Sequence, residues 1–297
     1  MKTRRFWTIF CPQTCHRASV VITLLLVILC AGAEAWIAAP EKAWFGTHTL
    51  IPWGPHEIDL QTLPPAPPDP TRQHWLGTDA AGRDVLARLV YGLRLSFALS
   101  LGICLASFMI ATLIAMLSAL APPWVDLCTQ RFIELWSHLP FLYILMGLSS
   151  LVRGGVGLFL GAVVAFSWTQ LCLLLRAQLL VARGSEATLA AKLFGFSTGR
   201  IAFVHLLPYL YPLFFSLMPF SLGATLSSLT ALDMLGFGLP IEWPSWGQLL
   251  QEGLSHPRAP WLTWPVLFGM IAILTLTSLI GEASRKAWHP RQASEFR

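Results

Sequence analysis

Residues 95–125 read LSFALSLGICLASFMIATLIAMLSALAPPWV and contain no Asp, Glu, Lys or Arg. An α-helix rises about 1.5 Å per residue, so roughly 20 apolar residues cross the hydrocarbon core of a bilayer, which is about 30 Å thick. A helix also satisfies its backbone hydrogen bonds internally, as a lipid environment requires. We therefore predict a membrane-spanning helix in this stretch, ended by Pro122 and Pro123.

Further uncharged runs extend this pattern along the chain of 297 residues, which is 55% hydrophobic and only 12% charged. Soluble domains carry about 25% charged residues, so the composition excludes an ordinary cytosolic enzyme and a disordered chain. We predict an all-α polytopic membrane protein with about six transmembrane helices. Besides the first run, the candidates are residues 154–175, 206–232 and 259–281, with shorter ones at 135–152 and at 18–39, where Glu34 interrupts the run.

The basic residues predict how these helices are oriented. With both termini in the cytoplasm, 13 of the 20 Lys and Arg residues fall on the inner side and 7 on the outer side, as the positive-inside rule favours. Topology thus accounts for the net charge of +5, and we expect contact with the lipid bilayer and not with nucleic acid. The alternative, a signal peptide cleaved near Ala31, Ala33 or Ala35, would leave five helices and an external N-terminus.

The six cysteines predict neither a disulfide nor a metal site. None falls in a predicted outer loop, so we expect no disulfide there. Cys11, Cys15 and His16 have a spacing that loosely resembles a metal site, but reduced thiols in a basic cytoplasmic tail at 1–17 explain them better. We expect no metal and no cofactor in this chain.

The sequence contains no recognised catalytic or nucleotide-binding motif. No Lys lies in a Gly-x-x-x-x-Gly-Lys-Ser/Thr pattern, so the chain has no P-loop, and we expect no catalytic residue. Glu34 is the chief charged residue within a predicted span, whereas ion-coupled carriers keep ionisable groups near the middle of the membrane. An ion-coupled secondary transporter and a membrane-embedded enzyme are therefore the weaker alternatives, and active transport would draw its energy from a partner.

Two predicted outer segments have distinct compositions. Residues 40–94 begin with a Pro-rich spacer, and then residues 76–94 alternate Arg and Asp with apolar residues at helical spacing. We predict that 76–94 form an amphipathic helix on the membrane surface, starting near Thr78 and Asp79; the alternative is a solvated charged face. The second segment, residues 233–258, is rich in Gly, Pro and Trp and is predicted to be a loop.

The polar segment 181–205 lies on the predicted inner side. Residues 186–194 favour a short helix, Gly195 supplies a left-handed turn, and Ser197 can cap a second short helix. A helix–turn–helix with small residues on one face is suited to docking into a groove of another protein.

This segment resembles the EAA coupling loop of ABC importer permeases. The family pattern is Glu, a pair of Ala, Gly nine residues after the Glu, and His-x-Leu-Pro, and the chain has each of these. It departs at Ala187, where the family often has a bulky residue, and at Tyr209, where it often has Asn. The resemblance implies that an ATPase subunit grips this loop, with Glu186 near a basic group and the Ala pair allowing close approach. The residues we assign to coupling are Glu186, Ala190, Ala191, Gly195, Ser197, His205 and Pro208.

Other segments narrow the family. Residues 76–94, 235–247 and 289–291 resemble the permeases of dipeptide, oligopeptide and nickel importers. Residues 130–136 are similar to the subgroup that imports oligopeptides and the peptide-nucleotide microcin C. The outer family motif comprises Gly77, Thr78, Asp79, Gly82, Arg83, Asp84, Arg88, Gly92 and Arg94.

The resemblance implies an architecture and a set of partners. It implies a type I ABC importer permease-like fold in the bacterial inner membrane, with a transmembrane core at 95–281 and a cytoplasmic tail at 282–297. The chain would form half of the translocation path, together with a homologous second permease subunit, two cytoplasmic ATP-binding subunits and a periplasmic solute-binding protein that docks near residues 76–94 and 233–258. The ATPase activity would lie on the separate subunits. The expected substrate is an oligopeptide or a peptide-like compound, and the alternative is nickel or a metal chelate.

Overall fold

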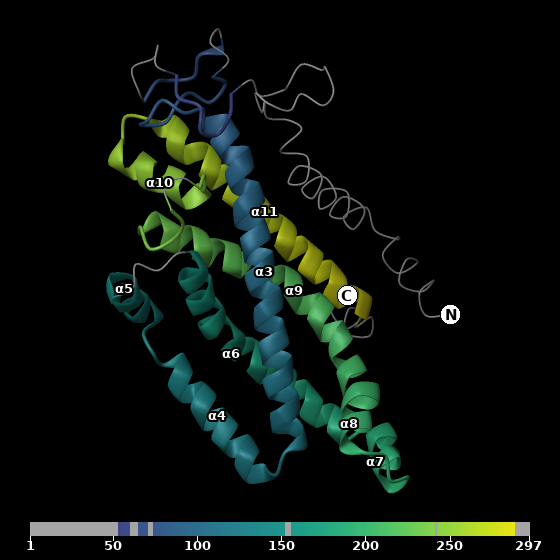
Figure 1. Ribbon diagram of the computed structural model, residues 1–297. Coiled ribbons are helices and arrows are strands. Elements are labelled where there is room, and N and C mark those ends of the chain that lie inside the picture. The colour runs from purple at the N-terminus through teal and green to yellow at the C-terminus, as the bar shows by residue number, and fades with distance from the viewer. Residues whose placement is uncertain (1–52, 60–64, 71–73, 152–155, 241–242, 289–297) are drawn as a thin grey trace. The chain divides into compact units, whose positions relative to one another are not determined.

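The computed structural model describes residues 53–59, 65–70, 74–151, 156–240 and 243–288, and these residues are mostly helical (Figure 1). The β-structure among them consists of isolated bridges in the segment that precedes α3. The elements are α3 (Val85–Leu120), α4 (Pro123–Ser137), α5 (Phe141–Leu151), α6 (Val156–Arg183), α7 (Glu186–Leu193), α8 (Thr198–Arg200), the π-helical turn η2 (Ile201–Leu206), α9 (Leu207–Met234), α10 (Trp246–Ser255) and α11 (Pro260–Trp288).

The chain divides into two compact units, which are described separately. Of the described residues, unit 1 contains 101–222 and 281–288, and unit 2 contains those from 53–100 and 223–280. The helices α3, α9 and α11 each contribute residues to both units.

Within the residues that the structure describes, four helical stretches are long and apolar enough to cross a membrane. They overlap four of the predicted runs, which confirms the polytopic helical class. The run predicted at 18–39, the tail at 1–17 and the Cys11, Cys15 and His16 group lie outside the described residues. The four stretches are Val85–Leu120, Val156–Arg183, Thr198–Met234 and Pro260–Arg285.

The helix predicted in the run 135–152 opens at Pro140, as the sequence indicates, and residues 135–137 belong to the helix before it. The helix α4 ends at Ser137, and α5 begins at Phe141 after a break that contains Pro140. Proline lacks an N–H and disfavours helical backbone at the residue before it, so it interrupts the helix and starts a new one. Its carbonyl accepts the N–H of Tyr143, 3.0 Å away, as expected for the first turn of α5.

The helix predicted at 76–94 is confirmed from Val85 onward, where it leads into the spanning helix, but its predicted start near Thr78 and Asp79 is wrong. Residues 76–84 are not helical, and α3 begins at Val85 and continues without a break to Leu120. Gly77 and Gly82 adopt φ values of 79° and 82°, a left-handed conformation that a helix cannot contain. At about 1.5 Å per residue the 36 residues of α3 extend for about 54 Å, well beyond the hydrocarbon core.

Unit 1 is held together by an apolar core and by charged links between its helices. The core is formed by side chains of α3, α4, α6, η2 and the start of α9. Arg176 of α6 donates to Asp126 of α4, with Nε 2.6 Å from Oδ1, and Ser118 of α3 donates to the same carboxylate. Arg183 donates to the carbonyl of Ala119 at 2.6 Å, which satisfies one of the free carbonyls at the end of α3. Two arginines that the topology assigns to the inner side are thus internal links.

Unit 2 contains a helix that the sequence analysis missed. The predicted loop at 233–258 includes α10, which starts where Ser245 accepts the N–H of Gln248 at 3.2 Å. Trp246 is buried, and its indole N–H donates to the carbonyl of Leu89 in α3 at 2.8 Å. A Cβ added at Gly269 of α11 would lie 2.8 Å from this indole ring, so the absence of a side chain there lets Trp246 fit.

We predict that Asp126→Asn lowers the free energy of unfolding by about 2 kcal/mol, because Arg176 loses its charged partner. The hydrogen bond from Arg176 holds the pKa of Asp126 at about 2, with burial opposing this effect. An unfolded Asp titrates near about 3.9, so the stabilisation is fully present above that pH and is lost as the pH falls through the folded pKa. Melting in detergent should therefore show the same loss at pH 5 and pH 8.

The control is Arg131→Gln, which removes an exposed pair with Glu134 and should change the melting temperature little. An equal loss in both variants would show that the Asp126–Arg176 pair has no special role.

Candidate functional site

The first candidate site is the docking hairpin, which we define as α7, the turn at Gly195 and α8 (residues 186–200). Figure 1 shows α7 and α8 together beyond the C-terminal end of α6. The N–H of Phe196 donates to the carbonyl of Ala191 at 3.1 Å, and the N–H of Gly195 donates to that of Lys192 at 3.0 Å. With a φ of 74° at Gly195, this is a complete Schellman ending of α7. Ser197 caps α8 by accepting the N–H of Arg200 at 3.4 Å, so the predicted helix, turn and cap are all confirmed.

The hairpin turns apolar side chains toward solvent. Leu193 and Phe194 are 89% and 81% exposed, and Leu189 is also exposed. Glu186 is exposed in the first turn of α7. The sequence analysis missed these three apolar residues, although they lie inside the recognised loop.

Ala191 packs within the chain. It is buried against the core of unit 1, so it permits a close approach of α7 to that core. Thr188 is buried as well, and its hydroxyl donates to the carbonyl of Ala182 at 2.9 Å. These two residues fix α7 onto the end of α6, while Ala190 is only half-buried.

The hairpin continues into α9 through the turn η2. The guanidinium of Arg200 lies 4.3 Å from the centre of the Phe196 ring, and the His205 ring lies 6.2 Å from that ring. His205 thus lies at the loop–helix junction, as expected. Among the described residues no group of three or more His, Cys, Asp or Glu side chains could hold a metal ion.

The second candidate site is a buried charged network in unit 2, centred on Arg88 of α3. Arg88 is fully buried. Its Nη1 donates to Asp79 and, at 2.8 Å, to Glu252 of α10, and its Nη2 donates to Gln248 of α10 at 3.2 Å. Asp79 also accepts from Nε of Arg83 at 2.8 Å. We call these five residues the Arg88 network.

A second buried pair lies beside the start of α3. Nδ1 of His74 is 2.8 Å from Oδ2 of Asp84, and Nε2 is 3.5 Å from Asp59. Burial raises the pKa of Asp84, while its hydrogen bonds with the Ala87 N–H and with His74 oppose that rise. Asp84 also caps α3, since its Oδ1 accepts the Ala87 N–H at 2.8 Å.

Asp233 organises the turn that leads from α9 to α10. Its carboxylate accepts the N–H of Leu239 at 2.7 Å and the hydroxyl of Ser245. A Cβ at Gly238 would lie 2.3 Å from Asp233, and one at Gly247 would lie 2.6 Å from it. The Gly-rich family motif at 235–247 therefore allows the backbone to close around one carboxylate.

Most of the outer family motif is thus internal. Thr78, Asp79, Asp84 and Arg88 are buried, so these side chains hold the segment together and do not form its surface. At Gly92 an added Cβ would lie 3.1 Å from Trp246, so α10 packs closely against α3 there, and Arg94 lies 5.9 Å from the Tyr91 ring centre. The Ser245-x-x-Gln248 pattern is a helix-start signal that would have predicted α10.

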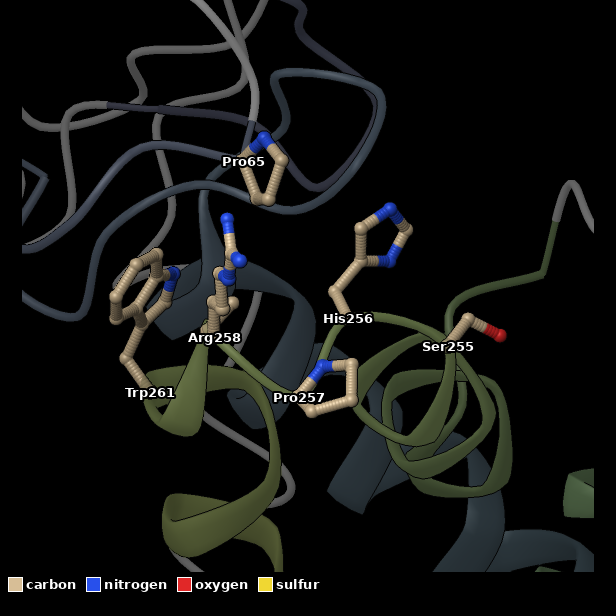
Figure 2. A pocket seen from close by; sticks show the side chains of 7 residues that line it. Pro65, Ser255, His256, Pro257, Arg258 and Trp261 are labelled. Carbon is tan, nitrogen blue, oxygen red and sulfur yellow. The ribbon is translucent and has the colours of Figure 1, made fainter.

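The surface of unit 2 has a cavity of about 520 Å³ between the loop at Pro65 and the junction of α10 and α11. Figure 2 shows the Arg258 and His256 side chains rising from this junction toward Pro65, with the Trp261 ring to one side. Trp261 is fixed by a 3.2 Å hydrogen bond from its indole N–H to the carbonyl of Thr78. The lining contains the cationic Arg258 and the rings of His256 and Trp261 but no carboxylate, so it is suited to an anionic group.

The fold and these two sites define a polytopic helical membrane protein with an apolar docking hairpin. Residues 107–293 match the family described as binding-protein-dependent transport system inner membrane component, and the chain belongs to this family. The resemblance inferred from the motifs is confirmed, and the chain is a multi-pass permease component of the inner membrane. Ion-coupled carriers are a different class, so that alternative is set aside.

Named relatives agree with this assignment. The inner membrane ABC transporter permease protein YejE of Escherichia coli K12 is 40% identical over 82% of this chain and 71% of its own length. The peptidoglycan transport system permease protein YejE of Agrobacterium fabrum is 38% identical over 74% of this chain and 58% of its own length. The dipeptide transport system permease protein DppC of Bacillus subtilis is 29% identical over 80% of this chain and 75% of its own length.

We predict that Arg88→Leu destabilises the chain by about 3–5 kcal/mol, because it leaves the carboxylates of Asp79 and Glu252 without their buried cation and with only the partly exposed Arg83 beside them. The expected result is a large fall in melting temperature in detergent or in the amount of protein in the membrane. The partly exposed Arg83 is the control, and Arg83→Leu should cost clearly less.

The second test is the double variant Arg88→Leu with Asp79→Leu, which should recover part of the lost stability since it removes a buried charge. No recovery would contradict the view that unpaired charge causes the loss.

Proposed function

We propose that this chain is the permease subunit of a binding-protein-dependent importer of peptides or peptide-containing compounds. It works with a homologous second permease, two cytoplasmic ATPase subunits and a solute-binding protein, and both of its termini lie in the cytoplasm. The observation that carries the proposal is the exposed apolar end of the docking hairpin, on a chain whose relatives are named as ABC and dipeptide permeases.

The docking hairpin has the internal bonds and the core contact that a rigid coupling element requires. Its two helices are joined by a Schellman turn and a capped start, and Ala191 ties α7 to the core of unit 1. The exposed Leu193 and Phe194 would enter a groove on an ATPase subunit, with Glu186 facing a basic group. When two ATPase subunits close on ATP, the hairpin would move as one piece and pass its movement to the helices that it joins.

The binding protein would dock on the surface of unit 2 around Arg258, next to the cavity at the junction of α10 and α11. The support is the chemistry of that cavity, where Arg258 and His256 face solvent beside Trp261 and are suited to an acidic surface. The buried Arg88 network holds α10, which leads to this surface, against α3. A loaded binding protein would then release its solute into the path formed with the second permease.

A peptide is the substrate class that the relatives' names favour, with nickel as the alternative within the wider family. No described group of His, Cys, Asp or Glu side chains is suited to a metal ion, which also favours a peptide. The deciding measurement is calorimetric titration of the cognate binding protein with di- to pentapeptides, muropeptides and Ni²⁺. Micromolar or tighter binding of a peptide class is expected, and binding of Ni²⁺ alone would overturn the substrate assignment.

We predict that Gly195→Pro abolishes peptide uptake, because proline holds φ near about −65° whereas this position requires 74°. Gly195→Ala should weaken uptake, since an L side chain is strained by about 1 kcal/mol in this conformation. Uptake of labelled peptide into proteoliposomes of the full complex is the measurement.

The matched control is Gly199→Ala, because Gly199 is also an exposed glycine of the hairpin with open space around it but lies in α8 at an ordinary helical φ. It should leave uptake unchanged. Equal effects at the two glycines would argue against the left-handed turn as the important feature.

We predict that Arg258→Glu lowers binding-protein-dependent uptake about tenfold at low ionic strength, because it repels the acidic surface expected there. The defect should shrink in high salt, where exposed charges are screened beyond about 3 Å at 1 M. Arg258→Lys is the control and should retain most uptake. A defect that is independent of salt and shared by the lysine variant would contradict an electrostatic docking role.

A further inference from the structure

The helical run from the docking hairpin into the membrane contains one widened turn. Residues Ile201–Leu206 form the π-helical turn η2 between α8 and α9, and the N–H of Leu207 donates to the carbonyl of Ala202, five residues back. An α-helix would use the carbonyl of Phe203, so this turn holds one extra residue. Turns of this kind are rare and frequently lie at functional sites.

Pro208 is one cause of the widened turn. It has no N–H to offer the carbonyl of Val204, and its ring pushes that carbonyl away. Pro212 and Pro219 impose the same loss further along the chain, yet α9 remains an α-helix through both. Proline alone therefore does not explain the turn, and a second cause must act at 201–206.

Packing is the second cause. Ile201, Ala202 and Leu206 are buried in the core of unit 1, where η2 contacts α6 and α7, whereas Phe203 and Val204 are exposed. The turn thus rests on the hairpin and on α6, and then continues directly as the spanning helix α9. It is the only covalent route by which movement of the hairpin reaches α9.

The turn leaves one side chain unsatisfied. Nδ1 of His205 is buried and has no hydrogen-bond partner in the part of the chain that the structure describes. A buried polar atom without a partner is costly, so this arrangement is not the most favourable one for His205. A change of the turn would move this ring relative to Phe196, which lies on the hairpin side.

We propose that residues 201–206 are a joint that changes between a π-helical and an α-helical turn during the transport cycle. Loss of the extra residue from the turn rotates the helix on one side by about 100° and shifts it by about 1.5 Å relative to the other side. Movement of the hairpin is thereby converted into rotation of the start of α9. The joint rests on the proposed function, because the hairpin is moved only when an ATPase holds it.

Deletion of Val204 is the sharpest test, since it removes the extra residue and leaves the flanking helices with their own sequences. The full complex with both permeases, the ATPases and the binding protein is placed in liposomes. The measurement is the ratio of ATP hydrolysis with and without peptide-loaded binding protein. We expect the deletion to lower this stimulation at least tenfold while the ATPases still co-purify. Pro212→Ala changes a proline in a regular part of α9 and should stay within twofold of the wild type.

Each result of these measurements either supports or overturns the joint or the proposed function. Stimulation within twofold of wild type in the deletion variant overturns the joint. If that variant does not assemble, Pro208→Ala decides, because it restores an N–H for the Val204 carbonyl. A threefold or greater loss relative to Pro212→Ala supports the joint, and no difference overturns it. A wild-type complex without any stimulation would instead overturn the proposed function.

A distance measurement tests the change of turn directly. Gly199 and Tyr211 are exposed, belong to unit 1 and flank the joint, so spin labels can be attached at both after the native cysteines are replaced by serine. We expect the distance distribution between the labels to shift when the ATPases are trapped with nucleotide. One unchanged distance in both states overturns the joint, since a rigid helix would give that result.

Discussion

The burial of charge is the constraint on which this chain depends, because a charged group removed from water must find its partners within the protein. Arg88 meets this constraint with Asp79 and with Glu252, which lies 164 residues further along the sequence. One guanidinium thus fastens a loop, α3 and α10 to one another. The packing of Trp246 against α3 depends on these bonds between α3 and α10. So does the position of the surface that contains Arg258, which follows α10 in the chain.

The two sites follow opposite rules. In unit 2 the polar side chains of the family motif turn inward, and they form hydrogen bonds with other residues of the same chain. In the docking hairpin of unit 1 the large apolar side chains turn outward, where nothing in the described chain covers them. The first arrangement produces a rigid platform, and the second produces a surface that requires a partner. A permease that takes its energy from separate subunits, as we propose for this chain, would need both.

Local features were predicted from the sequence, and distant pairings were not. The helix, turn and cap around Gly195 follow from residues within one short segment, so spacing alone predicts them. The amphipathic pattern at 76–94 was misread because burial of Arg88 depends on Glu252 and Gln248, which no local pattern reveals. Asp126 and Arg176 likewise meet across 50 positions. The helix α10 could have been predicted, since its starting pattern at Ser245 is local.

The exposure of Leu193 and Phe194 also bears on how a cell must produce this chain. Large apolar side chains left uncovered outside the lipid favour self-association, and they mark a subunit as incomplete. If ATPase subunits cover these side chains, as proposed, a permease made in excess of them would be prone to aggregation and to degradation by proteases. Balanced synthesis of the subunits, as well as the strength of their binding, would then determine how much of this chain persists in the membrane.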